Sequence, residues 1–349
     1  MKVNKHTLRS SLWASLLVVF IAGCSAYTQS AKNIRVVSAK TIVNPVAPEG
    51  HDPWVMQKDG KYYYLYSHEG SIWLNQHDLL QEAVQFAGKI IWTPPKGTEY
   101  SEEIWAPEIF FIDDHWYVYF AADDGDNANH RMYVLKSKTA NPYSEYEFVG
   151  KLTDPSDKWA IDGTLLQHQQ KLYFIWSGWE GDKNIQQNIY IAEMDSPTTI
   201  ASQRVLISQP DYAWEKVGTP LVNEGPQILK NAAGDVFVIY SASGSWTDSY
   251  ALGQLRLNGN DPLIAESWVK HPEAVFLGTD KVFSPGHASF TKSPDGSEDW
   301  IVYHTAKFKG AGWNRDVNMK KFTWDKQGNP VFGQPTEKGL VVPAPSHTQ

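Results

Sequence analysis

Hydrophobic residues along the chain gather into pairs of short runs, each pair joined by a polar turn. In one pair, Ile161–Leu166 carries an acid, Asp162, near its start and leads through Gln167–Lys171 to the aromatic-rich run Leu172–Ser177. Two such runs separated by a short polar turn predict a β-hairpin. The same pattern occurs four more times, opening at Asp52, Ala106, Glu224 and His287.

These hairpins begin at intervals of roughly 54 to 63 residues. A repeat with a period this long indicates a solenoid, a propeller or an array. All-β units of about this size are typical of four-stranded blades around a central channel. We therefore predict an all-β fold, a five-bladed β-propeller. Its outer strands would come from the apolar runs between the hairpins, and the only stretch with a helical pattern is Leu79–Phe86.

The repeat also sets the domain organisation. The chain has 349 residues, and length alone favours two or three domains. Because the hairpins occupy most of that length, we predict one propeller domain over residues 34–349, preceded by a polar tether at residues 24–33. Ile34–Val43 is predicted as its first strand, and Val331–Phe332 and Leu340–Val342 as its closing strands.

Residues 1–23 have the pattern of a secretory signal peptide. Basic residues precede the apolar run Leu12–Ala22, which is too short to span a bilayer. The run ends in Ile21–Ala22–Gly23–Cys24, which resembles a bacterial lipobox, where the signal peptide is removed and the cysteine is lipidated. Ser25 follows, with no Asp to retain the protein at the inner membrane, so we expect a lipid anchor in the outer membrane of a Gram-negative cell. The alternative is an ordinary signal with an incidental cysteine and a periplasmic protein.

Charge and composition narrow the class of partner. A net charge of −8 argues against nucleic acid or an anionic membrane surface. The chain has 15 Trp, and those not needed in a core suit stacking against sugar rings. Cys24 is the only cysteine, so a disulfide within the chain is excluded. We expect a monomer that acts on a carbohydrate.

Three carboxylates stand at the openings of their hairpins: Asp52, Asp162 and Glu224. Each taken alone is typical of a turn or a solvated surface. In a propeller, however, the inner strands all start at the same end of the channel, so the three acids would meet in one pocket. Acids brought together are costly unless one of them stays protonated. A glycosidase uses this arrangement, with one neutral and one ionised carboxyl group.

Five short motifs, in chain order, give the sequence a specific resemblance. They are Asp52–Pro53, Trp105–Ala106–Pro107–Glu108, Ile161–Asp162–Gly163, Asn223–Glu224–Gly225–Pro226 and Gly286–His287. Together they resemble glycoside hydrolase family 43, the five-bladed propellers that remove arabinose or xylose from plant polysaccharides and invert the anomeric centre. The resemblance covers roughly residues 44–343.

The resemblance implies a role for each acid. Asp52 matches the family's general base and Glu224 its general acid. Asp162 matches the residue that orients the acid and raises its pKa. His287 would lie at the floor of the channel, where family members hold a water or a metal ion, here calcium or sodium. No cofactor is otherwise expected.

Other residues are weaker candidates for substrate binding. Glu108 lies two positions deeper in its hairpin, so it would either bind a substrate hydroxyl or brace a strand. Arg315 would reach the pocket, or else pair with Asp316 at the surface. Tryptophans at strand starts or in loops would stack on sugar rings or fill the core: Trp54, Trp105, Trp179 and Trp246.

Two further features are interpreted as structural. His68 and His304 each follow a strand and are expected to be ordinary structural histidines. Asp123–Asn127 resembles the start of a calcium loop but lacks the glutamate that an EF-hand requires, so it is predicted to be a turn.

The segments Ile239–Asp248 and Asp299–His304 resemble the exo-acting α-L-arabinofuranosidase branch of the family. The resemblance implies release of L-arabinofuranose from arabinan, arabinoxylan or their oligosaccharides. Within the same fold, the alternatives are an endo-arabinanase or a single-domain β-xylosidase. From a different class, a non-catalytic glycan-binding lipoprotein stays open, although binding alone does not require three acids.

Overall fold

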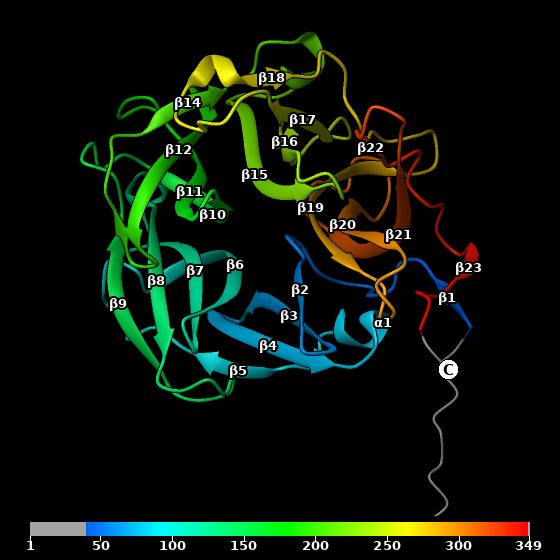
Figure 1. The fold of residues 1–349 in the computed structure, drawn as a ribbon, viewed down its shortest axis with the longest axis horizontal. Helices are drawn as coiled ribbons and strands as arrows, with labels where there is room; N and C mark the ends of the chain where they lie inside the picture. The colour runs from blue at the N-terminus through cyan, green and yellow to red at the C-terminus, as the bar shows by residue number, and fades with distance from the viewer. Residues whose placement is uncertain (1–39, 348–349) are drawn as a thin grey trace, which may run out of the picture. The chain divides into compact units, whose positions relative to one another are not determined.

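Antiparallel sheets follow one another around a ring in chain order, as the colour sequence of Figure 1 shows. The computed structural model describes residues 40–347. In each blade the first strand lies nearest the central channel, and later strands lie progressively further out. The five-bladed β-propeller predicted from the repeat is confirmed.

The strands of each blade are as follows. The first blade contains β2 (Trp54–Lys58), β3 (Lys61–His68), β4 (Ser71–His77) and β5 (Lys89–Trp92). The second contains β6 (Glu102–Ile112), β7 (His115–Asp123), β8 (Arg131–Ser137) and β9 (Tyr146–Leu152). The third contains β10 (Ala160–His168), β11 (Lys171–Gly178) and β12 (Gln186–Ser196), with the short outer strands β13 (Thr199–Ile200) and β14 (Val205–Ser208).

The fourth blade contains β15 (Leu221–Lys230), β16 (Val236–Ala242), β17 (Ala251–Leu257) and β18 (Trp268–Lys270). The fifth contains β19 (Phe283–Lys292), β20 (Asp299–Ala306), β21 (Arg315–Trp324) and β22 (Pro330–Val331). A short parallel pairing between β12 and β15 joins the third blade to the fourth.

The hydrophobic core consists of clusters between neighbouring blades, because the middle strands are buried on both faces. In β3, Tyr62 and Tyr64 pack toward the fifth blade, whereas Tyr63 and Leu65 pack toward the second. Successive side chains of a strand point to opposite faces. A strand that is buried on both faces is therefore apolar at every position, which explains the unbroken aromatic runs in the sequence.

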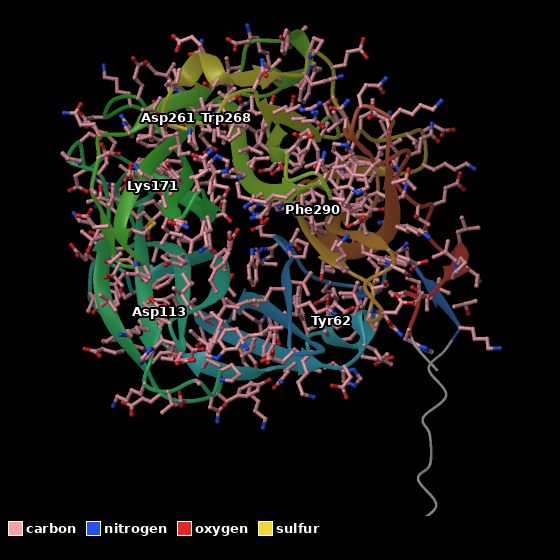
Figure 2. The ribbon with its side chains drawn as sticks, in the orientation of Figure 1. Tyr62, Asp113, Lys171, Asp261, Trp268 and Phe290 are labelled. Atoms are coloured by element: carbon pink, nitrogen blue, oxygen red, sulfur yellow. The ribbon has the colours of Figure 1, made fainter. Side chains whose placement is uncertain are left out.

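The first and fifth blades close the ring through side chains and a small separate sheet. The Tyr62 hydroxyl donates a hydrogen bond of 2.7 Å to the Lys292 carbonyl at the end of β19. Figure 2 shows Tyr62 and a β19 residue, Phe290, on these two blades. The Asn44 side chain exchanges two hydrogen bonds with the backbone of Met319 on β21. Strand β1 (Thr41–Val43) pairs with β23 (Val341–Pro343), so β23 differs by one residue from the predicted closing strand.

Helical structure among the described residues is short. The predicted helix is confirmed as α1 (Leu80–Ala83), and three single turns of 3₁₀ helix occur, η1 (Asn127–Asn129), η2 (Ala213–Glu215) and η3 (Ala265–Ser267). Asp123–Asn127 connects β7 to η1, as expected for a turn.

Within residues 40–347 no helix has the length and apolar character needed to cross a bilayer. The signal peptide, Cys24, the tether and residues 34–39 of the predicted first strand lie outside the described residues.

Candidate active site

At the mouth of the channel, each inner strand carries a residue in the left-handed backbone region or, in the first blade, follows one by two positions. The φ angles are 46° for Asp52, 40° for Ala106, 56° for Asp162, 54° for Gly225 and 43° for His287. At four of these positions the register with the next strand shifts, which is the mark of a β-bulge. Bulges redirect side chains, and strained residues of this kind concentrate at functional sites.

This geometry corrects the sequence register in the fourth blade. The residue equivalent to Asp52 and Asp162 is Gly225, so Glu224 lies one position earlier than the repeat predicted. A Cβ at Gly225 would lie 3.1 Å from Nδ1 of His287, which leaves little room for a side chain there. The Gly225 N–H instead donates a hydrogen bond of 3.0 Å to Oδ2 of Asp162. The third blade thereby fixes the backbone beside Glu224.

The structure brings the three predicted acids into one pocket of about 670 Å³. Asp52, Asp162 and Glu224 all line it. Four of the predicted substrate-binding residues also line it, and they come from the second, fourth and fifth blades: Trp105, Trp246, His287 and Arg315.

Asp52 is surrounded by basic side chains. Its Oδ1 lies 3.1 Å from Nδ1 of His287 and 3.7 Å from Nη1 of Arg315, and its Oδ2 lies 3.0 Å from Nδ1 of His51. Burial alone would raise the pKa of Asp52, but His287 and His51 outweigh it and hold the pKa well below its usual range. Asp52 is therefore ionised at neutral pH, as a general base must be. Arg315 faces Asp52 and not Asp316, which pairs with Lys338.

His304 also hydrogen-bonds Asp52. The sequence alone instead predicts that His304 is an ordinary structural histidine. Its Nδ1 accepts a hydrogen bond of 3.1 Å from the Asp52 backbone N–H. Burial, followed by the charge of Arg315, lowers the pKa of His304 to about 3, so the ring is neutral and able to accept. This bond crosses from the fifth blade to the first.

Two serines occupy the same place in their own hairpins as His304. The Ser177 hydroxyl donates to the Asn223 carbonyl at 2.9 Å, and the Ser241 hydroxyl accepts from the His287 N–H at 2.8 Å. In three blades, therefore, the end of the second strand bonds the start of the next blade's inner strand. A hairpin places the end of its second strand beside the start of its first strand, where the predicted acids lie. The position of His304 at the end of its second strand was therefore a signal in the sequence that this residue lies near the pocket.

Glu224 is buried next to a phenol. Its Oε1 accepts a hydrogen bond of 2.8 Å from the Tyr250 hydroxyl. Burial is the largest cause that raises the pKa of Glu224, to about 7; the Tyr250 hydrogen bond opposes the rise and the charge of Asp52 adds to it. Glu224 thus retains a proton near neutral pH, as a general acid must.

Asp162 shares this buried environment. Burial first, and then the charges of Glu224 and Asp52, raise its pKa well above the usual range for an aspartate. The interpretation from sequence gave like-charge repulsion as the reason for a neutral Glu224. The structure instead makes burial the larger cause for both carboxyl groups, with repulsion second for Asp162.

Two predicted substrate contacts do not line the pocket. Trp54 is 6% exposed and packs on Phe110 with ring centroids 5.0 Å apart, so it belongs to the core between the first two blades. Glu108 is 2% exposed, and its Oε1 accepts a hydrogen bond from the Gln227 amide. Both follow a left-handed residue by two positions, deeper than the acids, so they brace the structure beneath the pocket instead of facing it.

The environment of His287 bears on the expected metal ion. Its Nδ1 faces Asp52, and residues 40–347 contain no group of three or more His, Cys, Asp or Glu side chains arranged to hold a metal. Calcium takes six to eight oxygen ligands, which can include waters, so water would have to supply most of the ligands of an ion at this position. A calcium or sodium ion near His287 stays a prediction, and no step below depends on it.

Several pocket residues were not anticipated from sequence. Trp159, which lines the pocket, stacks on Trp179 with ring centroids 4.8 Å apart, so Trp179 supports this wall from behind. Ser245 and the exposed Trp313 also line the pocket, beside Trp246. These residues lie in connections between strands, where the repeat carries no information about position.

Comparison with known proteins agrees with this geometry. Residues 28–330 match glycosyl hydrolases family 43. The extracellular exo-α-(1→5)-L-arabinofuranosidase of Streptomyces avermitilis is 35% identical over 316 residues, which cover 86% of this chain and 65% of that protein. The enzyme of the same name from Streptomyces chartreusis is 31% identical over 274 residues, covering 76% of this chain and 83% of that one.

A solved structure extends the agreement to three dimensions. The α-L-arabinofuranosidase from Lactobacillus brevis is 33% identical and matches with a TM-score of 0.79, over 85% of this chain and 98% of that one. The match to the family covers all five blades and includes each of the three acids in the pocket. This chain belongs to glycosyl hydrolases family 43.

Proposed function

We propose that this protein is an inverting, exo-acting α-L-arabinofuranosidase that releases L-arabinofuranose from arabinan, arabinoxylan or their oligosaccharides. One observation carries the proposal: Glu224, whose pKa burial raises to about 7, lines the same pocket as Asp52, whose pKa is held well below its usual range. The relatives described above, which are named as arabinofuranosidases, support the choice of sugar.

In this mechanism the two carboxyl groups act on opposite sides of the glycosidic bond. Glu224 donates its proton to the leaving glycosidic oxygen, while Asp52 removes a proton from the water that attacks the anomeric carbon. The bond to the leaving oxygen breaks as the bond to water forms, so the anomeric centre inverts. Afterwards Asp52 carries the proton that came from water, and exchange with solvent restores both groups.

The surrounding residues position these groups. His287 and Arg315 fix the Asp52 carboxylate. Asp162 accepts the Gly225 N–H and thereby fixes the backbone that carries Glu224. Each of these contacts joins two different blades, so the constellation depends on closure of the ring.

The test is the product formed from a panel of substrates. We expect free arabinose from arabinan, arabinoxylan and arabino-oligosaccharides, and NMR of the first product should show the β-anomer released from an α-linkage. Release of oligosaccharides would indicate an endo-arabinanase, and turnover of β-xylosides alone would indicate a β-xylosidase. Binding of these glycans with no turnover would support the non-catalytic alternative.

We also propose that the protein is exported and anchored by a lipid on Cys24 in the outer membrane of a Gram-negative cell. Export is supported by the signal-peptide pattern and by the relatives described as extracellular. The anchor is supported only by the lipobox-like Ile21–Cys24. The expectation of a monomer stays a prediction.

A further inference from the structure

Trp313 is unusually exposed for a tryptophan that lines a pocket. It lies between β20 and β21, is 67% exposed, and lines the same pocket as Glu224. An exposed aromatic ring in the lining of a pocket offers a large apolar surface to a ligand. Trp246, its neighbour in the pocket wall, is only partly buried.

The indole ring of Trp313 is held in a fixed position despite its exposure. Its only polar atom, Nε1, donates a hydrogen bond of 3.1 Å to Oγ of Ser245. The ring meets Trp246 edge-to-face, with centroids 6.1 Å apart and planes at 69°. Because its N–H is already bonded to the protein, the ring presents an apolar surface to whatever occupies the pocket mouth.

The two segments that form this wall are bonded to each other. The Gly310 N–H donates to Oδ1 of Asp248 at 2.7 Å, and Nη2 of Arg315 donates to the Ser245 carbonyl at 2.8 Å. These bonds tie the β20–β21 connection to the β16–β17 connection on both sides of Trp313. A preorganised surface loses little entropy when a ligand binds to it.

The wall lies on the acid side of the pocket. Ser245, which accepts the Trp313 N–H, lines the pocket together with Glu224 and is near enough to lower the pKa of that carboxyl group. A general acid must come within about 2.6–3.2 Å of the oxygen that it protonates. In the proposed mechanism the leaving oxygen therefore lies near Glu224, and the wall that contains Trp313 is within the same pocket as that oxygen.

We propose that Trp313 is the platform on which the sugar residue of the leaving group stacks, and so determines which aglycones the enzyme accepts. This inference rests on the proposed function, with Glu224 as the acid. The C–H face of a sugar ring is apolar, and a fixed indole with a satisfied N–H matches it. A short alkyl leaving group has no such face and gains nothing from the ring.

The test compares two substrates that share the arabinosyl group but differ in the leaving group. Arabinotriose leaves a sugar, whereas methyl α-L-arabinofuranoside leaves methanol; aryl glycosides are avoided because an aryl ring also stacks on indole. For Trp313→Ala we expect kcat/KM to fall roughly 3- to 10-fold on arabinotriose, the range that an aromatic contact provides. On the methyl glycoside we expect kcat/KM to stay near the wild-type value.

Two further variants separate stacking from damage to the wall. Phe308→Ala removes another exposed aromatic of the same connection, 58% exposed and outside the pocket lining, and should leave the ratio of the two kcat/KM values unchanged. Trp313→Phe keeps a ring but loses the N–H, and should keep most of the preference for arabinotriose. Thermal unfolding of each variant confirms that the fold is intact.

The outcomes distinguish this inference from the proposed function. An equal loss on both substrates, no loss on arabinotriose, or the same effect from Phe308→Ala would overturn the role of Trp313 and leave the arabinofuranosidase proposal standing. If the wild-type protein hydrolyses neither substrate, the proposed function is wrong and the platform role is wrong with it.

Discussion

The Tyr250 hydroxyl donates a hydrogen bond of 2.8 Å to Oε1 of Glu224, and the Tyr250 ring stacks on His304 with centroids 5.6 Å apart. His304 in turn accepts the backbone N–H of Asp52. Two stacked rings thus connect the proposed acid to the proposed base across three blades. A Cβ at Gly286 would lie 2.2 Å from the Tyr250 ring, so the ring needs a glycine at that position.

The Tyr250 contact predicts a change in the pH profile. Tyr250→Phe removes a hydrogen bond that favours the ionised form of Glu224, so the pKa of Glu224 should rise from about 7. The basic limb of kcat/KM should therefore move upward by about one pH unit, the equivalent of a hydrogen bond to a charged group. Tyr303→Phe is the control, because the Tyr303 hydroxyl accepts a hydrogen bond from the Thr336 N–H and none is found between it and a carboxyl group within residues 40–347. A basic limb that stays in place in Tyr250→Phe would argue against Glu224 as the titrating acid.

Replacing Asp162 should move the same limb in the opposite direction. Asp162 and Glu224 are buried neighbours whose charges repel, so the last proton of the pair is held more tightly than that of one carboxyl group alone. Asp162→Asn keeps an oxygen for the Gly225 N–H but removes the second charge. We expect the basic limb to move downward, as measured by kcat/KM against pH on an arabino-oligosaccharide. An upward shift would contradict this coupling.

The placement of Trp54 in the core predicts a loss of stability without a loss of substrate binding. Trp54→Ala should reduce the free energy of unfolding by about 3–5 kcal/mol, as large aromatic deletions in cores do. KM should be nearly unchanged wherever the variant is folded. Trp105→Ala is the matched comparison, because Trp105 lines the pocket and should raise KM. Denaturant unfolding together with initial-rate kinetics measures both quantities, and a raised KM in Trp54→Ala would restore Trp54 as a substrate contact.

The proposed lipid anchor gives a prediction about location alone. Cys24→Ser should release the protein from the membrane fraction without changing kcat/KM, because Cys24 lies before the blades in the sequence. Mass spectrometry of the native protein should show a mature chain that begins with an acylated Cys24. An unmodified N-terminus elsewhere would refute lipidation.

The fold could be predicted from the sequence because each blade contains its own hairpin, and a hairpin is a local pattern. The same argument placed Asp52 and Asp162 at the channel mouth. For the fourth blade the predicted register was wrong by one residue, because Gly225, and not Glu224, takes the left-handed conformation at the bulge. A bulge inserts a residue into one strand, and hydrophobic alternation does not reveal which residue takes the left-handed conformation.

The residues that support the acids were harder to find from the sequence. Tyr250 reaches Glu224 from the end of the β16–β17 connection, and Trp313 reaches the pocket from the β20–β21 connection, so neither shares the hairpin register. Glu108 was set apart correctly by its deeper position, but depth alone did not show that it turns away from the ligand. Such positions are decided by packing between blades, which no local pattern encodes.

The central claim is that Glu224 protonates the leaving oxygen, and leaving-group dependence tests it most directly. The measurement is kcat/KM of Glu224→Gln relative to wild type on an arabino-oligosaccharide and on 4-nitrophenyl α-L-arabinofuranoside. A sugar alkoxide needs the proton, so the loss on the oligosaccharide should be of the order of 10²–10⁴-fold. Nitrophenolate leaves without help, so its loss should be far smaller, whereas Asp52→Asn should fail on both substrates. Equal losses on the two substrates for Glu224→Gln, or a rate near that of wild type on the oligosaccharide, would contradict the account.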